Sequence, residues 1–154
     1  MPVREVSYEV DGWGTGTIWL EDGVVVWHEL PAARNGRPEA KPPPVVRRLQ
    51  RYFGGKRDDF ADVEIDLDWC TPFQRAVAET LRAVPYGEVV TYGELAALAG
   101  YPNAQRAAGT FCAHNRLALI VPCHRVVSAG GLGSYGSLGE GYKRRLLELE
   151  GVRM

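Results

Sequence analysis

The feature that most restricts the fold of this chain is a change in hydrophobic pattern before the middle of the sequence. Residues 4–10, 14–20 and 24–30 are rich in Val, Ile, Trp and Tyr, and glycine-containing turns separate them. Later in the chain, apolar residues recur at helical spacing behind sequences that cap helices. We therefore expect an α/β protein with a small antiparallel-sheet domain over residues 1–68 and a mainly helical domain over residues 69–154.

The N-terminal domain contains three further signals. Residues 31–44 combine an Asn-Gly pair with a run of prolines, which predicts an exposed loop. Apolar residues between 45 and 53 have helical spacing, and a pair of glycines ends the pattern. Residues 63–67 alternate between apolar and acidic side chains, which predicts a half-buried strand.

Two sequences in the C-terminal domain are typical of helix starts. The segments 71–74 (Thr-Pro-Phe-Gln) and 91–94 (Thr-Tyr-Gly-Glu) are capping boxes, in which side chains satisfy the first free amides of a helix. The second box opens a short helix that stops at Gly100, and a turn leads to a third helix over residues 104–114. Two short helices joined in this way outline a helix-turn-helix. A last helix is predicted over residues 140–150.

Small side chains dominate the third predicted helix. Gly109 in its interior costs roughly 1 kcal/mol relative to alanine, so close packing on another helix or close approach to a nucleic-acid groove must offset it. Arg106 is either a solvated surface arginine or a cation suited to insertion into a base stack. Residues 91–154 carry a net charge of +3 against −4 for residues 1–90, which permits contact with nucleic acid without requiring it.

The cysteines Cys70, Cys112 and Cys123 have neither the spacing of a disulfide framework nor that of metal ligands. The histidines His28 and His114 complete no zinc site with them, so we expect neither a metal nor a cofactor. No apolar run approaches the roughly 18 to 20 residues that span a bilayer. We expect a soluble cytoplasmic protein without a membrane partner, located at the nucleoid in a bacterium or in the nucleus of a eukaryote.

Cys123 stands in an unusual setting. The apolar run 117–121 predicts a buried segment that delivers residues 122–125, Pro-Cys-His-Arg, to a defined place. The simpler interpretation is that Cys123 is a buried structural cysteine, which is the more common role for a single cysteine. Its two cationic neighbours favour a reactive one, because positive charge lowers the pKa of a thiol and raises the fraction of thiolate.

His124 is the candidate base for this thiol. Adjacent residues do not face each other, so a proton would pass from Cys123 to His124 through a bend or a water molecule. A carboxylate that holds His124 would complete a set of nucleophile, base and orienting acid. Glu148 and Glu150 are both placed for this role, and a partner for Glu150 would explain a carboxylate at the negative end of a helix dipole.

The segment 121–127, Val-Pro-Cys-His-Arg-Val-Val, preceded by Asn115 and by segment 87–96, resembles the O6-alkylguanine-DNA alkyltransferase family. The resemblance covers roughly residues 71–151. It implies a ribonuclease H-like N-terminal domain and a winged-helix-like C-terminal domain with a helix-turn-helix. It also implies direct DNA repair, in which an alkyl group moves once from O6 of guanine, or O4 of thymine, in a flipped-out base to Cys123.

The resemblance assigns roles to individual residues. Cys123 would accept the alkyl group, His124 would act as a base through water, and Glu150 would orient His124. Asn115 would organise the active-site loop, and Tyr92 would crowd the phosphate beside the target and hydrogen-bond the base. The implied DNA-binding residues are Arg106, Tyr92, Ala107, Gly109 and Arg125, and the implied pocket residues are Cys112, Val126, Gly133, Tyr135 and Ser137.

The implied partner is double-stranded DNA that contains O6-alkylguanine. A monomer, with cooperative binding left open, would contact the minor groove, and Arg106 would replace the extruded nucleotide. The sequence departs from the family pattern at two places that affect pocket size. Arg116 follows Asn115 where proline is frequent, and residues 135–138 replace the usual Tyr-x-Gly-Gly.

Three other functions are compatible with parts of the pattern. A relative that only recognises alkylated DNA would lack the acceptor cysteine, so Cys123 argues against it. A Cys-His-Glu hydrolase would need an oxyanion hole, which the sequence does not indicate. A transcription regulator with Cys123 as a redox sensor is disfavoured by the single helix-turn-helix and the near-neutral charge.

Overall fold

The computed structural model describes residues 2–154, whose contacts form two compact units. The first unit includes a short segment, Arg116–Ile120, that is remote in sequence from the rest of it. The predicted division after residue 68 assigned this segment to the C-terminal domain, whereas it pairs with a strand of the first unit. The units comprise the chain to Asp66 with Arg116–Ile120, and Leu67–Asn115 with Val121–Met154.

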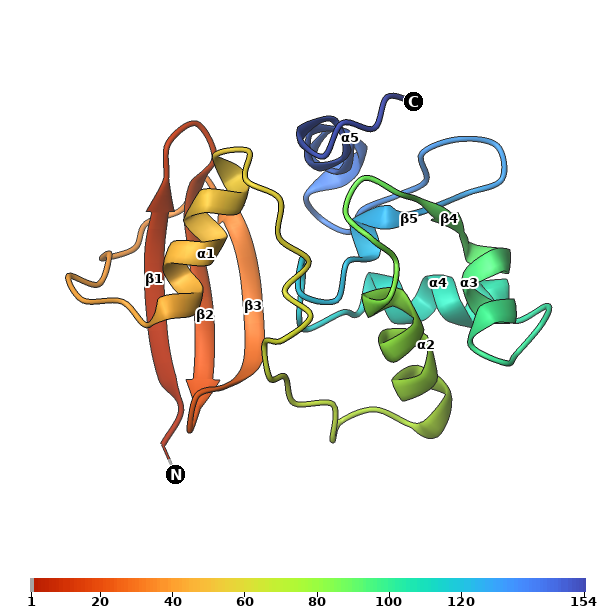
Figure 1. Ribbon diagram of the computed structural model, residues 1–154, viewed down its shortest axis with the longest axis horizontal. Coiled ribbons are helices and arrows are strands. Elements are labelled where there is room, and N and C mark those ends of the chain that lie inside the picture. Colours follow the sequence, from red (N-terminus) through yellow and green to blue (C-terminus); the bar gives the residue numbers. More distant parts are fainter. Residues whose placement is uncertain (1) are drawn as a thin grey trace. The chain divides into compact units, whose positions relative to one another are not determined.

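The first unit contains an antiparallel sheet of three strands in the order β1-β2-β3 (Figure 1). The strands β1 (Arg4–Val10), β2 (Gly14–Glu21) and β3 (Val24–Ala32) confirm those predicted from the sequence. Asp22 and Gly23 have φ angles of 51° and 79°, as the two-residue type I′ turn between β2 and β3 requires. The Asp-Gly pair therefore sets the register of this hairpin.

Helix α1 (Pro44–Phe53) lies over the sheet (Figure 1). Its start and the extension of β3 to Ala32 shorten the predicted loop over residues 31–44 at both ends. Burial of each large apolar side chain stabilises the unit by about 1.5–3 kcal/mol. The buried side chains of this core include Val6, Tyr8, Ile18, Val25, Val46, Leu49 and Tyr52.

The strand predicted over residues 63–67 is wrong. Only Ile65 pairs with the sheet, through an isolated parallel bridge to Val25. A second isolated bridge joins Leu117 to His28 further along β3. The edge of β3 is therefore shared between two segments, each of which forms a single bridge.

The second unit is mainly helical. The side chains of Thr71 and Thr91 form both predicted capping boxes. Gly100 and Asn103, with φ angles of 94° and 69°, reverse the chain between the two helices of the helix-turn-helix. The helices are α2 (Pro72–Arg82), α3 (Tyr92–Leu98), α4 (Gln105–Ala113) and α5 (Gly139–Leu149), which agree with the predicted positions.

A short parallel pair of strands brings the candidate site together. Strand β4 (Val90–Thr91) leads directly into α3, and β5 (Val126–Val127) directly follows the turn that carries Cys123. The pairing of β4 with β5 therefore places the start of α3 beside the Cys123 turn. Among residues 2–154, no helix is both long and apolar enough to cross a membrane.

Candidate active site at Cys123

Cys123 opens a single 3₁₀ turn, η1 (Cys123–Arg125), and is 4% exposed. The ring of Pro122 restricts φ before the turn, and the Cys123 amide donates a hydrogen bond to the carbonyl of Val121 at 2.8 Å. The leucines, isoleucine and valine of the run 117–121 are buried, as predicted. The sulfur is therefore presented by a rigid turn at the end of a buried segment.

Asn115 fixes this turn from the side. Its Nδ2 donates to the carbonyl of Val121 at 2.9 Å and to Sγ of Cys123 at 3.3 Å. One amide group thus holds both the backbone before the turn and the sulfur. These two hydrogen bonds connect Asn115 to the active-site loop, whose organisation the family resemblance implied for this residue.

The thiol of Cys123 is mainly protonated at neutral pH. Burial raises its pKa well above the ordinary value, and the thiol of Cys112 raises it further. The hydrogen bond from Asn115 and the charge of Lys143 act in the opposite direction without reversing the shift. The expectation of a lowered pKa from the two following residues is therefore wrong, and the surroundings of those residues explain why.

His124 is the first of these neighbours, and it is neutral. It is fully buried, and Nε2 donates to Oε2 of Glu150 at 2.7 Å. Burial lowers the pKa of the imidazole, and the hydrogen bond and charge of Glu150 only partly offset this. Nδ1 then carries the free lone pair, and it has no hydrogen-bond partner within residues 2–154. A buried imidazole with one oriented and one free nitrogen is suited to accept a proton.

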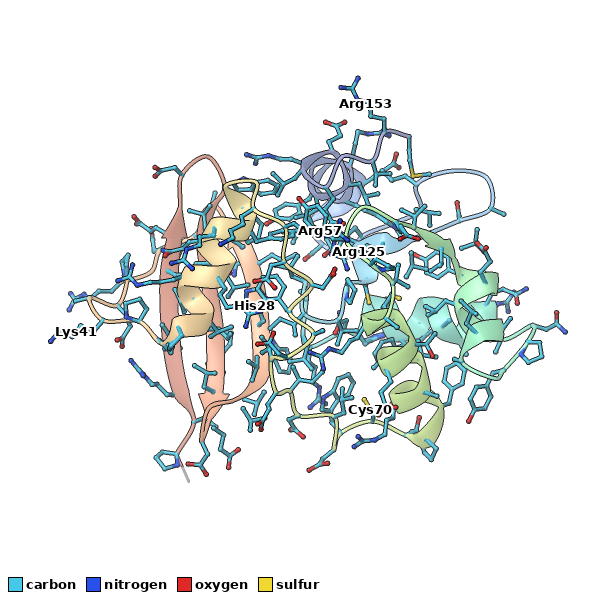
Figure 2. The ribbon with its side chains drawn as sticks, viewed as in Figure 1. His28, Lys41, Arg57, Cys70, Arg125 and Arg153 are labelled. Carbon is cyan, nitrogen blue, oxygen red and sulfur yellow. The ribbon has the colours of Figure 1, made fainter. Side chains whose placement is uncertain are left out.

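Arg125, labelled in Figure 2, is the second neighbour, and its burial shows that the predicted contact of its side chain with DNA is wrong. The residue is 2% exposed. Its guanidinium donates to both carboxylate oxygens of Glu150, at 2.9 and 3.0 Å, and to the carbonyl of Val84 at 2.9 Å. A buried guanidinium with these partners cannot reach a phosphate. Arg125 instead holds the carboxylate that holds His124.

Glu150 is the carboxylate at the centre of this network. It caps the C-terminus of α5 and also accepts a hydrogen bond from the amide of Gly87 at 3.1 Å. Burial alone would raise its pKa, but the hydrogen bonds and charges of His124 and Arg125 hold it well below the usual range. Glu148, the other candidate, is exposed. The partners of Glu150 account for its unfavourable position at the end of the helix dipole.

Sequence reasoning missed two of the groups that hold this network. The sequence does contain a signal for Gly87, because Pro-Tyr-Gly favours a turn at residues 85–87. The φ of 83° at Gly87 shows that this turn forms after α2. The carbonyl of Val84 carries none, since any residue at that position offers the same acceptor. Lys143 was also missed: it is buried, and its Nζ donates to the carbonyl of Ser134 at 3.3 Å.

A cavity of about 30 Å³ borders the sulfur. Of the predicted pocket residues, Cys112 and Tyr135 line it, whereas Val126, which is buried in β5, and Ser137, which is exposed, do not. This volume holds a water molecule but not a nucleobase. The complete lining consists of Tyr92, Gly109, Cys112, Ala113, Cys123, Ser134, Tyr135 and Gly136.

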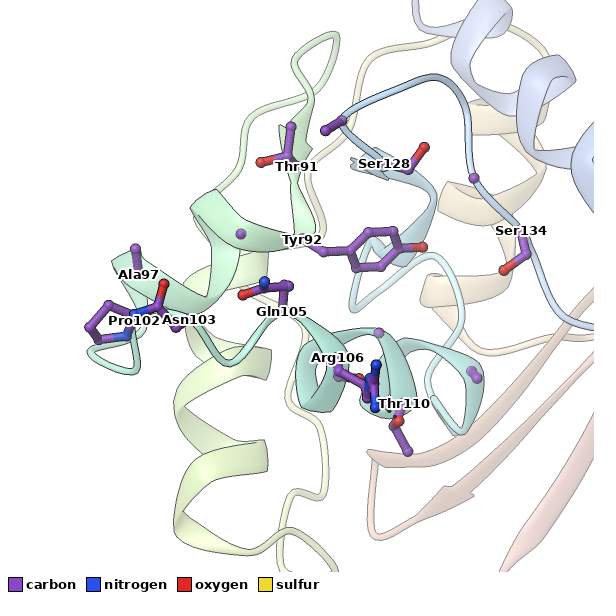
Figure 3. A pocket seen from close by; sticks show the side chains of 15 residues that line it. Thr91, Tyr92, Ala97, Pro102, Asn103, Gln105, Arg106, Thr110, Ser128 and Ser134 are labelled. Atoms are coloured by element: carbon purple, nitrogen blue, oxygen red, sulfur yellow. Dashed lines mark hydrogen bonds between the residues drawn. The ribbon is translucent and has the colours of Figure 1, made fainter.

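A larger hollow of about 1010 Å³ follows the helix pair (Figure 3). Figure 3 shows the ring of Tyr92 extending from the start of α3, and Arg106 and Thr110 projecting from α4. Gly133 also lines this hollow, whereas Ala107 is exposed outside it. The hollow and the small cavity are neighbours, because they share the lining residues Tyr92, Gly109, Ala113 and Ser134.

Tyr92 forms part of the wall between the two spaces. Burial raises the pKa of its hydroxyl to about 12, with a further contribution from Cys112 and Cys123, so the hydroxyl stays protonated at neutral pH. A Cβ at Gly109 or at Gly133 would meet the tyrosine ring at 3.8 or 3.6 Å. The glycine inside α4 therefore faces this ring, at a distance where an added Cβ would make an ordinary van der Waals contact.

Comparison with known proteins identifies relatives of the chain. The family model described as 6-O-methylguanine DNA methyltransferase, DNA binding domain, matches residues 72–152. A methylated-DNA--protein-cysteine methyltransferase of Mycobacterium tuberculosis is 50% identical over 109 residues, which cover 70% of this chain and 64% of the relative. The protein of the same name from Methanothermobacter thermautotrophicus is 34% identical over 144 residues, which cover 90% of this chain and 80% of the relative.

Solved structures extend the similarity to both units. Mycobacterium tuberculosis OGT in complex with DNA matches 96% of this chain and 92% of its own, with a TM-score of 0.80 and 38% identity. An O6-methylguanine-DNA methyltransferase from Pyrococcus kodakaraensis matches 98% of this chain and 100% of its own, with a TM-score of 0.73 and 27% identity. The N-terminal sheet, which has no distinctive motif, is therefore part of the shared fold.

Proposed function

Since this chain belongs to the 6-O-methylguanine DNA methyltransferase family, we propose that it repairs DNA by moving an alkyl group from O6 of guanine to the sulfur of Cys123. O4 of thymine offers the same chemistry as a second substrate. The observation that carries the proposal is the buried array of Cys123, His124 and Glu150 close to the hollow that follows the helix pair. A thioether has no easy hydrolytic route back to the thiol, so each molecule acts once.

The array accounts for how a protonated thiol becomes a nucleophile. The free Nδ1 of His124 takes the thiol proton through a water molecule, and the carboxylate of Glu150 stabilises the resulting imidazolium. The sulfur then attacks the alkyl carbon, the bond from that carbon to O6 breaks, and its electron pair stays with guanine. The hydroxyl of Tyr92 donates a hydrogen bond to the departing base.

We propose that DNA binds in the hollow along α3 and α4. Arg106 is exposed on α4, and within residues 2–154 its guanidinium has no ion pair. The small side chains around it allow the helix to approach the minor groove, where Arg106 fills the space of the flipped nucleotide. We propose that a monomer binds in this way.

Entry of a base requires the small cavity to widen. Its present volume, about 30 Å³, is far below that of guanine. Ser134 and Tyr135 form one wall, and they lie between Gly133 and Gly136, which have φ angles of 81° and 51°. We propose that this glycine-flanked loop moves outward when the base enters.

The test is the intact mass of the protein, with peptide mapping, after mixing with excess duplex that contains one O6-methylguanine. The expected result is a single methyl group on the Cys123 peptide, guanine restored in the DNA, and no second turnover. Cys123→Ala should bind the lesion without transfer, and Cys70→Ala is the matched control that should still be methylated. An unmodified protein that binds the lesion would indicate recognition alone, and turnover of an ester would indicate a hydrolase.

A further inference from the structure

The cavity beside Cys123 contains a second thiol that alkyl transfer does not use. Cys112 lines the same space from the C-terminal turn of α4, and Cys123 lines it from η1. Both cysteines are free. Two thiols that face one cavity from separate elements form a pair whose chemistry differs from that of either one alone.

The two cysteines border the same small space. The cavity that both line, about 30 Å³, has room for little more than a water molecule. The thiol of Cys112 also raises the pKa of the Cys123 thiol, as a neighbouring group does. A bond between the two sulfur atoms would form by approach of the two side chains across this small cavity.

We propose that Cys112 and Cys123 form a reversible disulfide when the protein encounters a peroxide. Cys112 is partly exposed, whereas Cys123 is buried, so the peroxide reaches Cys112 first. One peroxide oxygen adds to the Cys112 sulfur to give a sulfenic acid, and the other leaves as water. The Cys123 sulfur then attacks the Cys112 sulfur, and the displaced hydroxide leaves as water with the thiol proton of Cys123.

The disulfide would have two consequences. It removes the acceptor sulfur while the oxidant is present, and it prevents irreversible oxidation of Cys123 to a sulfinic or sulfonic acid. A dithiol reductant restores both thiols. The first consequence rests on the proposed alkyl transfer, whereas the disulfide itself does not.

Mass spectrometry can detect the bond directly. Trypsin cleavage after Arg106, Arg116 and Arg125 places the two cysteines on separate peptides, residues 107–116 and 117–125. After treatment with hydrogen peroxide, the intact chain should lose the mass of two hydrogen atoms. The two peptides should be joined without reductant and separate after dithiothreitol is added.

Three variants serve as controls. Cys70→Ser should still form the crosslink, because Cys70 does not line the cavity. Cys112→Ser and Cys112→Ala should form no crosslink, and Cys123 should instead accumulate oxygen atoms. A crosslink that includes Cys70, or oxygen addition to Cys123 in the unaltered chain as fast as in Cys112→Ser, would overturn the proposal.

An activity measurement separates this proposal from the proposed function. Transfer from O6-benzylguanine should be lost in the oxidised protein and return fully after reduction. If the crosslink forms but the reduced protein accepts no alkyl group, the proposed function fails and the disulfide stands. If the reduced protein accepts the alkyl group but peroxide produces no crosslink, the disulfide proposal fails alone.

Discussion

Two buried histidines, one in each unit, have opposite kinds of surroundings. His28 in β3 uses both ring nitrogens: Nδ1 donates to the carbonyl of Ala118 at 2.6 Å, and Nε2 accepts from the hydroxyl of Tyr8 at 2.6 Å (Figure 2). His124 in η1 uses only Nε2, on Glu150, and Nδ1 has no partner within residues 2–154. Burial lowers the pKa of both rings, so both are neutral at pH 7.

The difference indicates what each histidine does. A ring with both nitrogens satisfied has no capacity left for a proton, and His28 instead ties the segment before Cys123 to the sheet. A ring with one oriented nitrogen and one free nitrogen is prepared for proton transfer. Burial and a low pKa are common to both, so the unsatisfied nitrogen is what distinguishes the candidate base.

The same substitution at the two histidines should change different properties: the rate of alkyl transfer at His124 and the free energy of unfolding at His28. We expect His124→Gln to slow alkyl transfer by roughly 10²- to 10⁴-fold, as loss of a general base does. We expect His28→Gln to lower the free energy of unfolding by about 1–3 kcal/mol, because buried groups lose their partners, with the transfer rate of the folded molecules unchanged. Single-turnover rates and urea unfolding of both variants test this contrast, and equal rate losses would remove it.

Substitution of Glu150 should affect both properties together. Glu150→Gln removes one charge of a buried pair, so Arg125 loses its counter-ion and the free energy of unfolding should fall by about 3–5 kcal/mol. The transfer rate should also fall, because the amide stabilises an imidazolium poorly. Glu148→Gln, on the exposed face of α5, is the control that should change neither. Unchanged stability of Glu150→Gln in urea would contradict the network.

The pH dependence of the free energy of unfolding should show the effect of the lowered pKa of His28. Its pKa falls from 6.5 to about 4 in the folded protein, because of burial despite the hydrogen bond to Ala118. Between these values the unfolded chain binds a proton that the folded chain does not, so stability is complete above pH 6.5 and declines as the pH falls. We expect His28 to contribute a slope of about 1.4 kcal/mol per pH unit, and His124, whose pKa is also lowered, to contribute in the same direction. Urea unfolding from pH 7 to 5 should show a shallower slope in His28→Gln, and identical slopes would refute this origin.

The smallest effect should come from Arg106, outside both buried regions. Arg106→Ala should weaken repair of duplex DNA by about tenfold, equivalent to ~1.4 kcal/mol, and leave the reaction with free O6-benzylguanine unchanged. Arg153→Ala, at the exposed C-terminus, is the control for loss of a positive charge. Rates of transfer from duplex DNA and from free O6-benzylguanine test whether Arg106 contacts DNA. Equal losses of rate on both substrates would mean that it does not.

Local rules predicted much of the fold. The Asp22-Gly23 turn and the two capping boxes depend on residues within four positions of one another, and the structure forms all three. The predicted strand at residues 63–67 failed because an alternating pattern indicates which side chains are buried, but not how many residues pair with a neighbouring strand; only Ile65 pairs with Val25. Segment Arg116–Ile120 was assigned to the other domain for the same reason.

For the candidate site, too, the sequence predicted some features correctly and others not. The Pro-Cys-His-Arg motif singles out the candidate nucleophile and its neighbours, and the resemblance to a family selects Glu150 over Glu148. The motif also suggested a lowered pKa for Cys123, and the resemblance implied a contact between Arg125 and DNA; both were wrong. Each error assumed that a charged residue beside the thiol in sequence remains an unpaired charge in space.

The sequence by itself determined the three strands of the sheet, the helix caps and the choice of candidate reactive residues, because these depend on short-range geometry and side-chain chemistry. Tertiary structure decided the direction of the pKa shift of Cys123, the pairing of Arg125 with Glu150, and the position of Cys112 and Cys123 on one cavity. Burial and charge pairing depend on groups that lie far apart in the chain, such as Val84 and Glu150, and only the folded protein brings them together.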